Sequence, residues 1–109
     1  MTASAVPGTS VHTSVQGSVA TLHLTGSFDF SSHREFREFL TRSVSHPSVR
    51  ELRVDLSDVR HMNSSALGLL LLGLEQARAS KKTMSLCGVG GIVKQTLDTA
   101  NFGDLFAYA

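Results

Sequence analysis

The sequence predicts a single α/β domain with a mixed, largely parallel sheet of four or five strands and with helices packed mainly on one face. Three observations support this fold. Short stretches with alternating apolar and polar residues, typical of strands, are separated by longer stretches with helical periodicity. Strands that alternate with helices favour parallel pairing through right-handed crossovers. The 109 residues, of which 41% are hydrophobic, suffice for one core and no more.

We expect a flexible N-terminal tail at residues 1–9 and the folded domain at residues 10–109. The first eight residues, MTASAVPG, are mostly small and polar and end in a Pro-Gly pair. Apolar and polar residues then alternate over residues 11–16 and again over residues 20–25, and the Gly17-Ser18 pair between them suits a tight turn. The domain is therefore predicted to begin with an antiparallel hairpin.

Helices and strands alternate after the hairpin. A first helix is predicted at residues 32–44, because Ser32 and Glu35 have the spacing of a capping box. The next strand covers residues 52–56 and is predicted to end in a polar turn at residues 57–58. The remaining elements are a leucine-rich helix at about residues 64–80, a strand at residues 83–89, a turn at residues 90–91, a helix at residues 92–100 and a possible last strand at residues 105–108.

Charge and composition exclude several classes of function. Ten Lys and Arg residues oppose nine Asp and Glu residues, and the charges of residues 34–60 are mixed in sign. This distribution forms no basic stripe, so we expect no nucleic-acid partner. The longest apolar run, residues 66–74, falls well short of the roughly 20 residues of a membrane-spanning helix, so we expect no membrane insertion. A single cysteine, Cys87, and the lack of an export signal indicate a cytoplasmic protein.

Catalytic and ligand-binding interpretations have weak support. Ser64 or Ser65 could be imagined in a triad with a His and an Asp, but the sequence has no Gly-x-Ser-x-Gly motif. The five histidines lack the helical spacing of metal ligands, and Cys87 has no partner cysteine. Residues 88–91, GVGG, follow a predicted strand as phosphate-binding loops do, but a plain glycine turn explains them better. We therefore expect no enzymatic activity, metal or cofactor.

The turn into the leucine-rich helix is the strongest candidate for a functional site. Residues 61–68 read HMNSSALG, and Asn63, Ser64 and Ser65 are all favoured helix caps, which would explain them on structural grounds alone. A hydroxyl at the first helical positions nevertheless lies where free N–H groups and the helix dipole favour an added phosphate. Phosphorylation would add about −1.5 to −2 charges without breaking the helix. Such a site suits a switch that controls binding.

Two motifs of this sequence resemble those of the STAS domain family, in particular the bacterial anti-sigma-factor antagonists. The family pattern is a strand ending in Asp-Leu-Ser, a short spacer, and then Asp-Ser-Ser-Gly-Leu-Gly at the start of a leucine-rich helix. This sequence has DLS at residues 55–57 and NSSALG at residues 63–68. Residues 24–29, LTGSFD, are similar to the family's Leu-x-Gly-x-Leu-Asp loop, and the resemblance covers residues 11–106.

The resemblance implies a partner switch. In such proteins the unmodified antagonist binds an anti-sigma factor that is also a serine kinase of the histidine-kinase-like ATPase type. Phosphorylation by that kinase abolishes binding, and a PP2C-type phosphatase restores it. The phosphorylated serine corresponds to Ser64, with Ser65 as the second choice. The residues expected at the partner surface are Asp29, Asp58, His61, Met62, Asn63, Ser65, Ala66 and Leu67.

Two departures from the family pattern adjoin the predicted phosphorylation site. Asn63 replaces the usual Asp, which preserves capping but removes a negative charge. Ala66 replaces the usual Gly, which favours the helix by up to about 1 kcal/mol and is expected to offer a bulkier surface to a partner. The change at Asn63 leaves a second function open, because STAS domains also serve as constitutive subunits bound to the ATPase of a lipid-transport ABC system.

Overall fold

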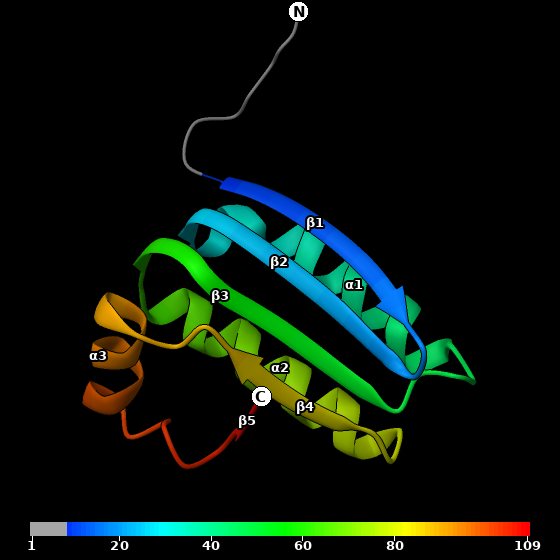
Figure 1. The fold of residues 1–109 in the computed structure, drawn as a ribbon. Helices are drawn as coiled ribbons and strands as arrows, with labels where there is room; N and C mark the ends of the chain where they lie inside the picture. The colour runs from blue at the N-terminus through cyan, green and yellow to red at the C-terminus, as the bar shows by residue number, and fades with distance from the viewer. Residues whose placement is uncertain (1–8) are drawn as a thin grey trace, which may run out of the picture.

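A five-stranded sheet with helices against one face organises the chain (Figure 1). The computed structural model describes residues 9–109. Neighbouring strands follow the order β1-β2-β3-β4-β5, and the pairing is antiparallel between β1 and β2 and parallel elsewhere. The strands are β1 (Thr9–Gln16), β2 (Val19–Phe28), β3 (Glu51–Met62), β4 (Thr83–Cys87) and β5 (Ala107–Tyr108). The predicted tail lies outside the described residues, except that Thr9 begins β1.

The connecting segments supply the helices. They are a 3₁₀ turn, η1 (Phe30–Ser32), and the helices α1 (His33–Ser45), α2 (Ser64–Ala79) and α3 (Gly91–Thr99). Because β2 to β5 are neighbours in sequence order, right-handed crossovers bring their connections to one face of the sheet. Figure 1 shows α1 and α2 behind the sheet, with the opposite face uncovered toward the viewer. The predicted mixed, largely parallel sheet with helices on one face is confirmed.

The core lies between the sheet and the helices. Alternate residues of β2 and of the first half of β3 are fully buried, and the residues between them are partly exposed. The strands contribute Leu22, Leu24, Leu52, Val54 and Leu56, and the helices contribute Phe36, Leu40, Leu70 and Leu74. On the uncovered face, the positions between these core residues are polar and include Thr21, His23, Arg53 and Asp55. The sheet therefore has one apolar and one polar face, as an amphipathic alternation requires.

Strand β3 is longer than predicted. The polar pair at residues 57–58 is not a turn, because β3 continues through it to Met62 beside β2. The register between the two strands shifts after His23 and again after Gly26, so the ladder absorbs extra residues and continues. Beyond Asp58 the buried positions are Val59 and Met62, which breaks the period-two pattern that predicts a strand.

The structure also corrects two predictions about where secondary-structure elements begin and end. Strand β4 ends at Cys87 because Gly88 adopts a left-handed φ of +69°, and a Cβ there would lie 2.5 Å from the backbone of Ser57. This close approach and the positive φ explain why position 88 requires glycine. The predicted capping box is absent, since the Ser32 side chain makes no cap hydrogen bond to α1. Its buried hydroxyl instead donates to the Ser27 carbonyl at 3.5 Å.

Candidate functional site

The candidate site lies where the chain leaves the carboxyl ends of the parallel strands β2 and β3. Ligand and partner sites of α/β proteins concentrate at this edge, where loops are free to vary. Asp29 follows β2 and Asn63 follows β3, and both border one shallow hollow together with Ile92 of α3. In Figure 1 the junction of β3 with α2 and the start of α3 lie at the same end of the sheet.

Asn63 caps α2 and holds Ser65 in place. Its backbone is extended, with φ of −126°, and its Oδ1 accepts hydrogen bonds from the backbone N–H groups of Ser65 at 3.1 Å and of Ala66 at 3.4 Å. The Ser65 hydroxyl also donates to Asn63 Oδ1 at 2.6 Å. One amide oxygen therefore satisfies three donors at the start of the helix, which is the preferred arrangement for an N-cap residue.

Ser64 and Ser65 differ in their availability for modification. Ser64 is the first residue of α2 and is exposed, whereas Ser65 is only partly exposed. Within the described residues the Ser64 hydroxyl has no hydrogen-bond partner, while the Ser65 hydroxyl is bound to Asn63. An incoming phosphate at Ser64 would also lie beside the positive end of the α2 dipole. The geometry therefore favours Ser64 over Ser65 as a phosphate acceptor.

Asp29 anchors the neighbouring turn. Its Oδ1 accepts hydrogen bonds from the backbone N–H of Ser31 at 2.9 Å and from the Ser31 hydroxyl at 2.5 Å. The hydroxyl hydrogen bond lowers the pKa of Asp29 below its ordinary value, and the backbone hydrogen bond adds to this effect. Asp29 is therefore a fixed negative charge at neutral pH on one border of the hollow.

The predicted partner-surface residues fall into two groups by their exposure to solvent. In the first group, Asp58, His61 and Asn63 are exposed, and Asp29 and Ser65 are partly exposed.

The second group is buried. Met62 and Leu67 are 9% and 8% exposed, and Ala66 is fully buried. These three side chains belong to the core beneath the turn, where they fix its position. The expectation that Ala66 offers a bulkier surface to a partner is wrong, because its methyl group faces the core.

Two exposed apolar side chains beside the site were not predicted. The Phe30 ring is 67% exposed and stacks on His33 with 4.8 Å between ring centroids, and Ile92 is 41% exposed. Exposed side chains of this size at the rim of a site suit contact with another protein. Phe30 was a detectable signal, since it follows the Asp29 loop, but Ile92 reaches the site only because α3 begins beside the end of β3.

A cluster of three titratable side chains, His23, Asp55 and Asp58, was also not predicted. His23 on β2 lies between two carboxylates of β3, with 2.9 Å from Nδ1 to Asp55 and 2.9 Å from Nε2 to Asp58. The hydrogen bond to Asp55 raises the pKa of His23, opposed in part by burial and supported by Asp58. Asp58 is thus engaged in fixing the irregular part of β3. Only the parallel register of β2 and β3 brings these three side chains together.

Neither a metal centre nor a membrane span emerges from the described part of the chain. Among residues 9–109, no group of three His, Cys, Asp or Glu side chains is placed to hold a metal ion. In the same range, no helix combines the length and apolar character needed to cross a membrane. The chemistry that the site offers is that of an exposed hydroxyl at a helix start, which borders a hollow with Ile92, and of a carboxylate and an exposed aromatic ring on the turn after β2.

Comparison with known proteins agrees with the fold. The family model described as "Mlab, STAS domain" matches residues 11–107. The chain belongs to the STAS domain family. A STAS-domain containing protein of Pseudomonas aeruginosa is 36% identical over 93 residues, which cover 85% of this chain and 90% of that protein.

Solved structures extend the comparison to more distant proteins. The anti-sigma factor antagonist SpoIIAA in its unphosphorylated form has a TM-score of 0.77 at 17% identity, covering 92% of this chain and 88% of SpoIIAA. A sulfate transporter family protein from Wolinella succinogenes has a TM-score of 0.72 at 16% identity, covering 87% of this chain and 80% of that chain. At such identities the likeness shows that the STAS fold is shared.

Proposed function

We propose that this STAS protein is an anti-sigma-factor antagonist that works as a partner switch controlled by phosphorylation of Ser64. Unphosphorylated, it binds an anti-sigma factor that is also a serine kinase of the histidine-kinase-like ATPase type. The observation that carries the proposal is the exposed Ser64 hydroxyl at the first position of α2, without a hydrogen-bond partner in the described chain, next to a Ser65 hydroxyl that Asn63 occupies. The fold that the chain shares with SpoIIAA supports the same role.

The switch follows from the electrostatics of the site. In the unmodified protein a partner meets a neutral Ser64 that borders a hollow with Ile92. The fixed charge of Asp29 and the exposed Phe30 lie on the neighbouring turn. A phosphate adds about −1.5 to −2 charges and a tightly held hydration shell. Apolar contact with Phe30 or Ile92 would then require removal of that hydration. Because the helix start accommodates the phosphate, the modification changes the surface and leaves the fold intact.

Phosphorylation in vitro tests the proposal. The protein is incubated with ATP and the histidine-kinase-like ATPase encoded near its gene, phosphate is located by mass spectrometry, and binding is measured by calorimetry before and after the reaction. We expect phosphate on Ser64 and loss of binding, and a PP2C-type phosphatase should restore binding. Ser65→Ala serves as the matched control and should still be phosphorylated. Absence of phosphate from both Ser64 and Ser65 would contradict the proposed switch.

A second candidate function, a constitutive subunit of a lipid-transport system, is favoured by Asn63. Asn63 removes the negative charge that the family usually has beside the phosphorylated serine, so the same surface would serve as a permanent contact on the ATPase of a lipid-transport ABC system. The family model that matches carries the description Mlab, and a transporter-family protein shares the fold. Affinity purification from cells separates the two functions. A co-purified transporter ATPase favours the second, and a small histidine-kinase-like ATPase favours the first.

Both functions imply a non-enzymatic protein in the cytoplasm. The anti-sigma factor and the ATPase of a transporter both act on that side of the membrane. A hydrolase using Ser64 is the enzymatic alternative, and it requires a base near the hydroxyl. Treatment with serine-reactive probes decides this point: we expect no labelling at Ser64, and labelling there would contradict the non-enzymatic role.

A further inference from the structure

Strand β3 has a bulge a few residues before the candidate site. Its register with β2 passes from the pair His23 and Asp55 to the pair Thr25 and Asp58, so β3 has one residue more than β2 in this interval. Beyond the bulge, β3 continues to the turn that begins at Asn63. Because a bulge bends the strand that carries it, this one sets the direction in which β3 enters the turn.

The side chains of Asp55 and His23 hold the bulge. Asp55 Oδ1 accepts hydrogen bonds from the backbone N–H of Ser57 at 3.0 Å and from the Ser57 hydroxyl at 2.7 Å. Asp55 Oδ2 lies 2.9 Å from His23 Nδ1, and Asp58 Oδ2 lies 2.9 Å from His23 Nε2. One imidazole ring on β2 therefore joins the residue before the bulge to the residue after it.

The two contacts of the ring require that it be protonated. Carboxylate oxygens only accept hydrogen bonds, and a neutral imidazole has a single N–H, so it can donate to one carboxylate at a time. Burial raises the pKa of Asp55, but hydrogen bonds from Ser57 and His23 outweigh it and hold that pKa below its ordinary value. Asp55 is therefore ionised at neutral pH, and the arrangement needs its second proton on the ring.

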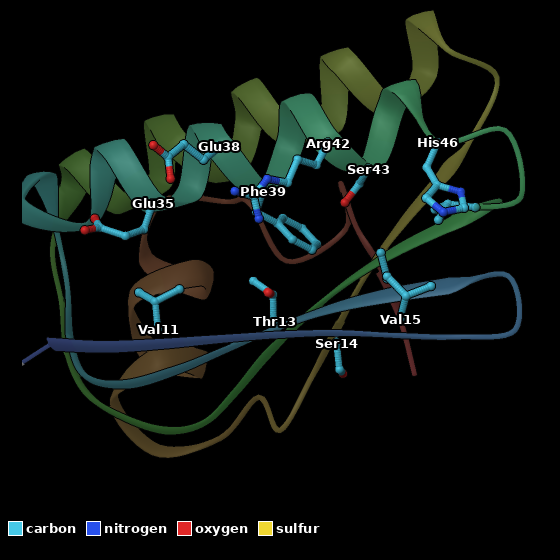
Figure 2. A pocket seen from close by; sticks show the side chains of 12 residues that line it. Val11, Thr13, Ser14, Val15, Glu35, Glu38, Phe39, Arg42, Ser43 and His46 are labelled. Carbon is cyan, nitrogen blue, oxygen red and sulfur yellow. The ribbon is translucent and has the colours of Figure 1, made fainter.

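His23 lies on the face of the sheet that no helix covers. Figure 2 shows that alternate side chains of β1, among them Val11 and Val15, point toward α1 around a groove of about 470 Å³, whereas Ser14 points away from it. His12 alternates in the same way as Ser14 and is the register partner of His23, so the two imidazoles share the uncovered face. In β1 the titratable side chain is that of His12.

The other charged and titratable groups near the ring belong to β3 and β4. Along β3, Arg53 precedes the two carboxylates and pairs with Glu51 at 3.0 Å, and the exposed Arg60 and His61 follow them. On β4, Cys87 is in register with Asp55. The groups in direct contact with the ring are thus two carboxylates, and carboxylates favour the charged form of an imidazole.

We infer that His23 is a positioning residue for the candidate site, and that it acts only when protonated. As an imidazolium it holds Asp58 against β2. When its proton passes to solvent, it releases Asp58 and with it the segment that leads from the bulge to Asn63. The inference concerns the geometry of the site and does not depend on which partner binds there.

The exposure of the two carboxylates decides which contact is lost. The Asp55 side chain is 26% exposed and is also fixed by Ser57, whereas the Asp58 side chain is 54% exposed, so water can replace the ring there. The proton therefore leaves Nε2, and the neutral ring keeps the N–H at Nδ1 that binds Asp55.

The direction of the pH dependence follows from the same contacts. The hydrogen bond to Asp55, opposed by burial and supported by Asp58, raises the pKa of His23 in the folded protein. The contact with Asp58 is therefore complete below about pH 6.5, the ordinary pKa of histidine, and is lost as pH rises through the raised pKa.

Nuclear magnetic resonance of the full chain, labelled with ¹⁵N, tests the inference in a titration from about pH 5.5 to pH 9.5. The ring nitrogens report protonation and tautomer, and the backbone amides of residues 60–63 report the position of the segment before the site. We expect these amides to shift with the midpoint of His23, and the neutral ring to be protonated at Nδ1. Because the free protein is measured, the outcome does not depend on phosphorylation of Ser64.

Three variants separate His23 from its neighbours. Asp58→Asn removes a charge and keeps the size of the side chain, and its amide can accept from a protonated Nε2 or donate to a bare one. It should lower the midpoint of His23 and abolish the coupled shift of residues 60–63. His12→Gln and His61→Gln are the matched controls, since each removes a nearby imidazole that does not bridge the carboxylates, and both should keep the coupled shift.

Several results would overturn the inference. Residues 60–63 could stay unchanged while His23 titrates, or the neutral ring could be protonated at Nε2. A coupled shift that persists in Asp58→Asn would show that Asp58 does not transmit the change, and a coupled shift that disappears in His12→Gln or His61→Gln would assign it to that histidine instead.

Discussion

The turns that begin at Asp29 and at Asn63 share one local geometry and differ in what they expose. In each, an extended Asp or Asn uses its Oδ1 to accept hydrogen bonds from both the backbone N–H and the hydroxyl of the serine two positions later. In each, the residue between them is exposed: Phe30 in the first turn and Ser64 in the second.

This difference separates recognition from control. The first turn has a carboxylate with a lowered pKa and an aromatic ring, neither of which changes at neutral pH. The second turn has a neutral cap and a hydroxyl, so its charge is near zero until it is modified. Under the proposed function, a partner that contacts both turns would be held by the first and controlled by the second. The predictions below change one turn at a time.

The largest effect is expected from the two phenylalanines on either side of Asp29. Phe28 is fully buried and packs against Phe36 with 5.7 Å between ring centroids, so Phe28→Ala should lower the free energy of unfolding by about 3–5 kcal/mol. Phe30 is 67% exposed, so Phe30→Ala should change it by no more than about 0.5 kcal/mol. Urea unfolding of both variants measures the contrast.

Phe30→Ala, which should hardly change stability, should have a large effect on partner binding. An exposed aromatic side chain at an interface centre contributes about 2 kcal/mol or more, so Phe30→Ala should weaken binding about 30-fold or more. A Phe30→Ala variant that binds normally would remove the first turn from the partner surface.

A permanent charge on the second turn is expected to have the next largest effect. Ser64→Asp should weaken partner binding about 30-fold or more, because the charge must be desolvated at the contact. Its free energy of unfolding should stay within about 1 kcal/mol of the unmodified protein, since a carboxylate suits the start of a helix. Calorimetry of Ser64→Asp beside the neutral Ser64→Ala measures the effect of charge alone. Equal loss of binding in both variants would indicate that the hydroxyl itself makes the contact.

The cap of the second turn is expected to contribute a smaller amount to stability. Asn63→Ala leaves the two N–H groups and the Ser65 hydroxyl without their shared acceptor, and should cost about 1 kcal/mol in the free energy of unfolding. Asn63→Asp keeps the acceptor and restores the family's usual acid, so it should be at least as stable as the natural chain. Thermal unfolding of the pair tests this, and the rate of Ser64 phosphorylation in Asn63→Asp tests whether the missing charge affects the kinase. Two equally stable variants would show that water replaces the cap.

The order of elements was predictable because it follows from local patterns, and the candidate site was chosen from local patterns in the same way. Alternation of apolar residues predicts β2, and the cap residues at the start of the leucine-rich helix mark the second turn. The extension of β3 was not predictable, since the register shifts beside Asp58 depend on its pairing with β2. Cap propensity does not choose between Ser64 and Ser65, because both are good cap residues. The family resemblance favours Ser64, and the coordinates add that the Ser65 hydroxyl is bound to Asn63.

Contacts between segments that are distant in the sequence were not predictable from local patterns. The groove between β1 and α1 depends on how far the helix stands from the edge strand, which no local pattern encodes. Ile92 reaches the hollow by the placement of α3, and His23 meets its two carboxylates by strand register. Each of these is set by packing between elements, so periodicity predicts the elements and leaves their contacts open.

The smallest expected effect distinguishes the two turns by pH. The pKa of Asp29 is lower in the folded protein than in the unfolded chain, so its hydrogen bonds stabilise the fold at neutral pH, and this contribution is lost as pH falls from about 4 through the lowered pKa. Asn63 makes the same contacts without titrating. Asp29→Asn should therefore unfold less steeply than the natural chain below about pH 4, while the pH dependence of Asn63→Ala should match that of the natural chain. Thermal unfolding from pH 7 to pH 3 measures the difference, and parallel curves for Asp29→Asn and the natural chain would mean that the Asp29 turn keeps its hydrogen bonds when protonated.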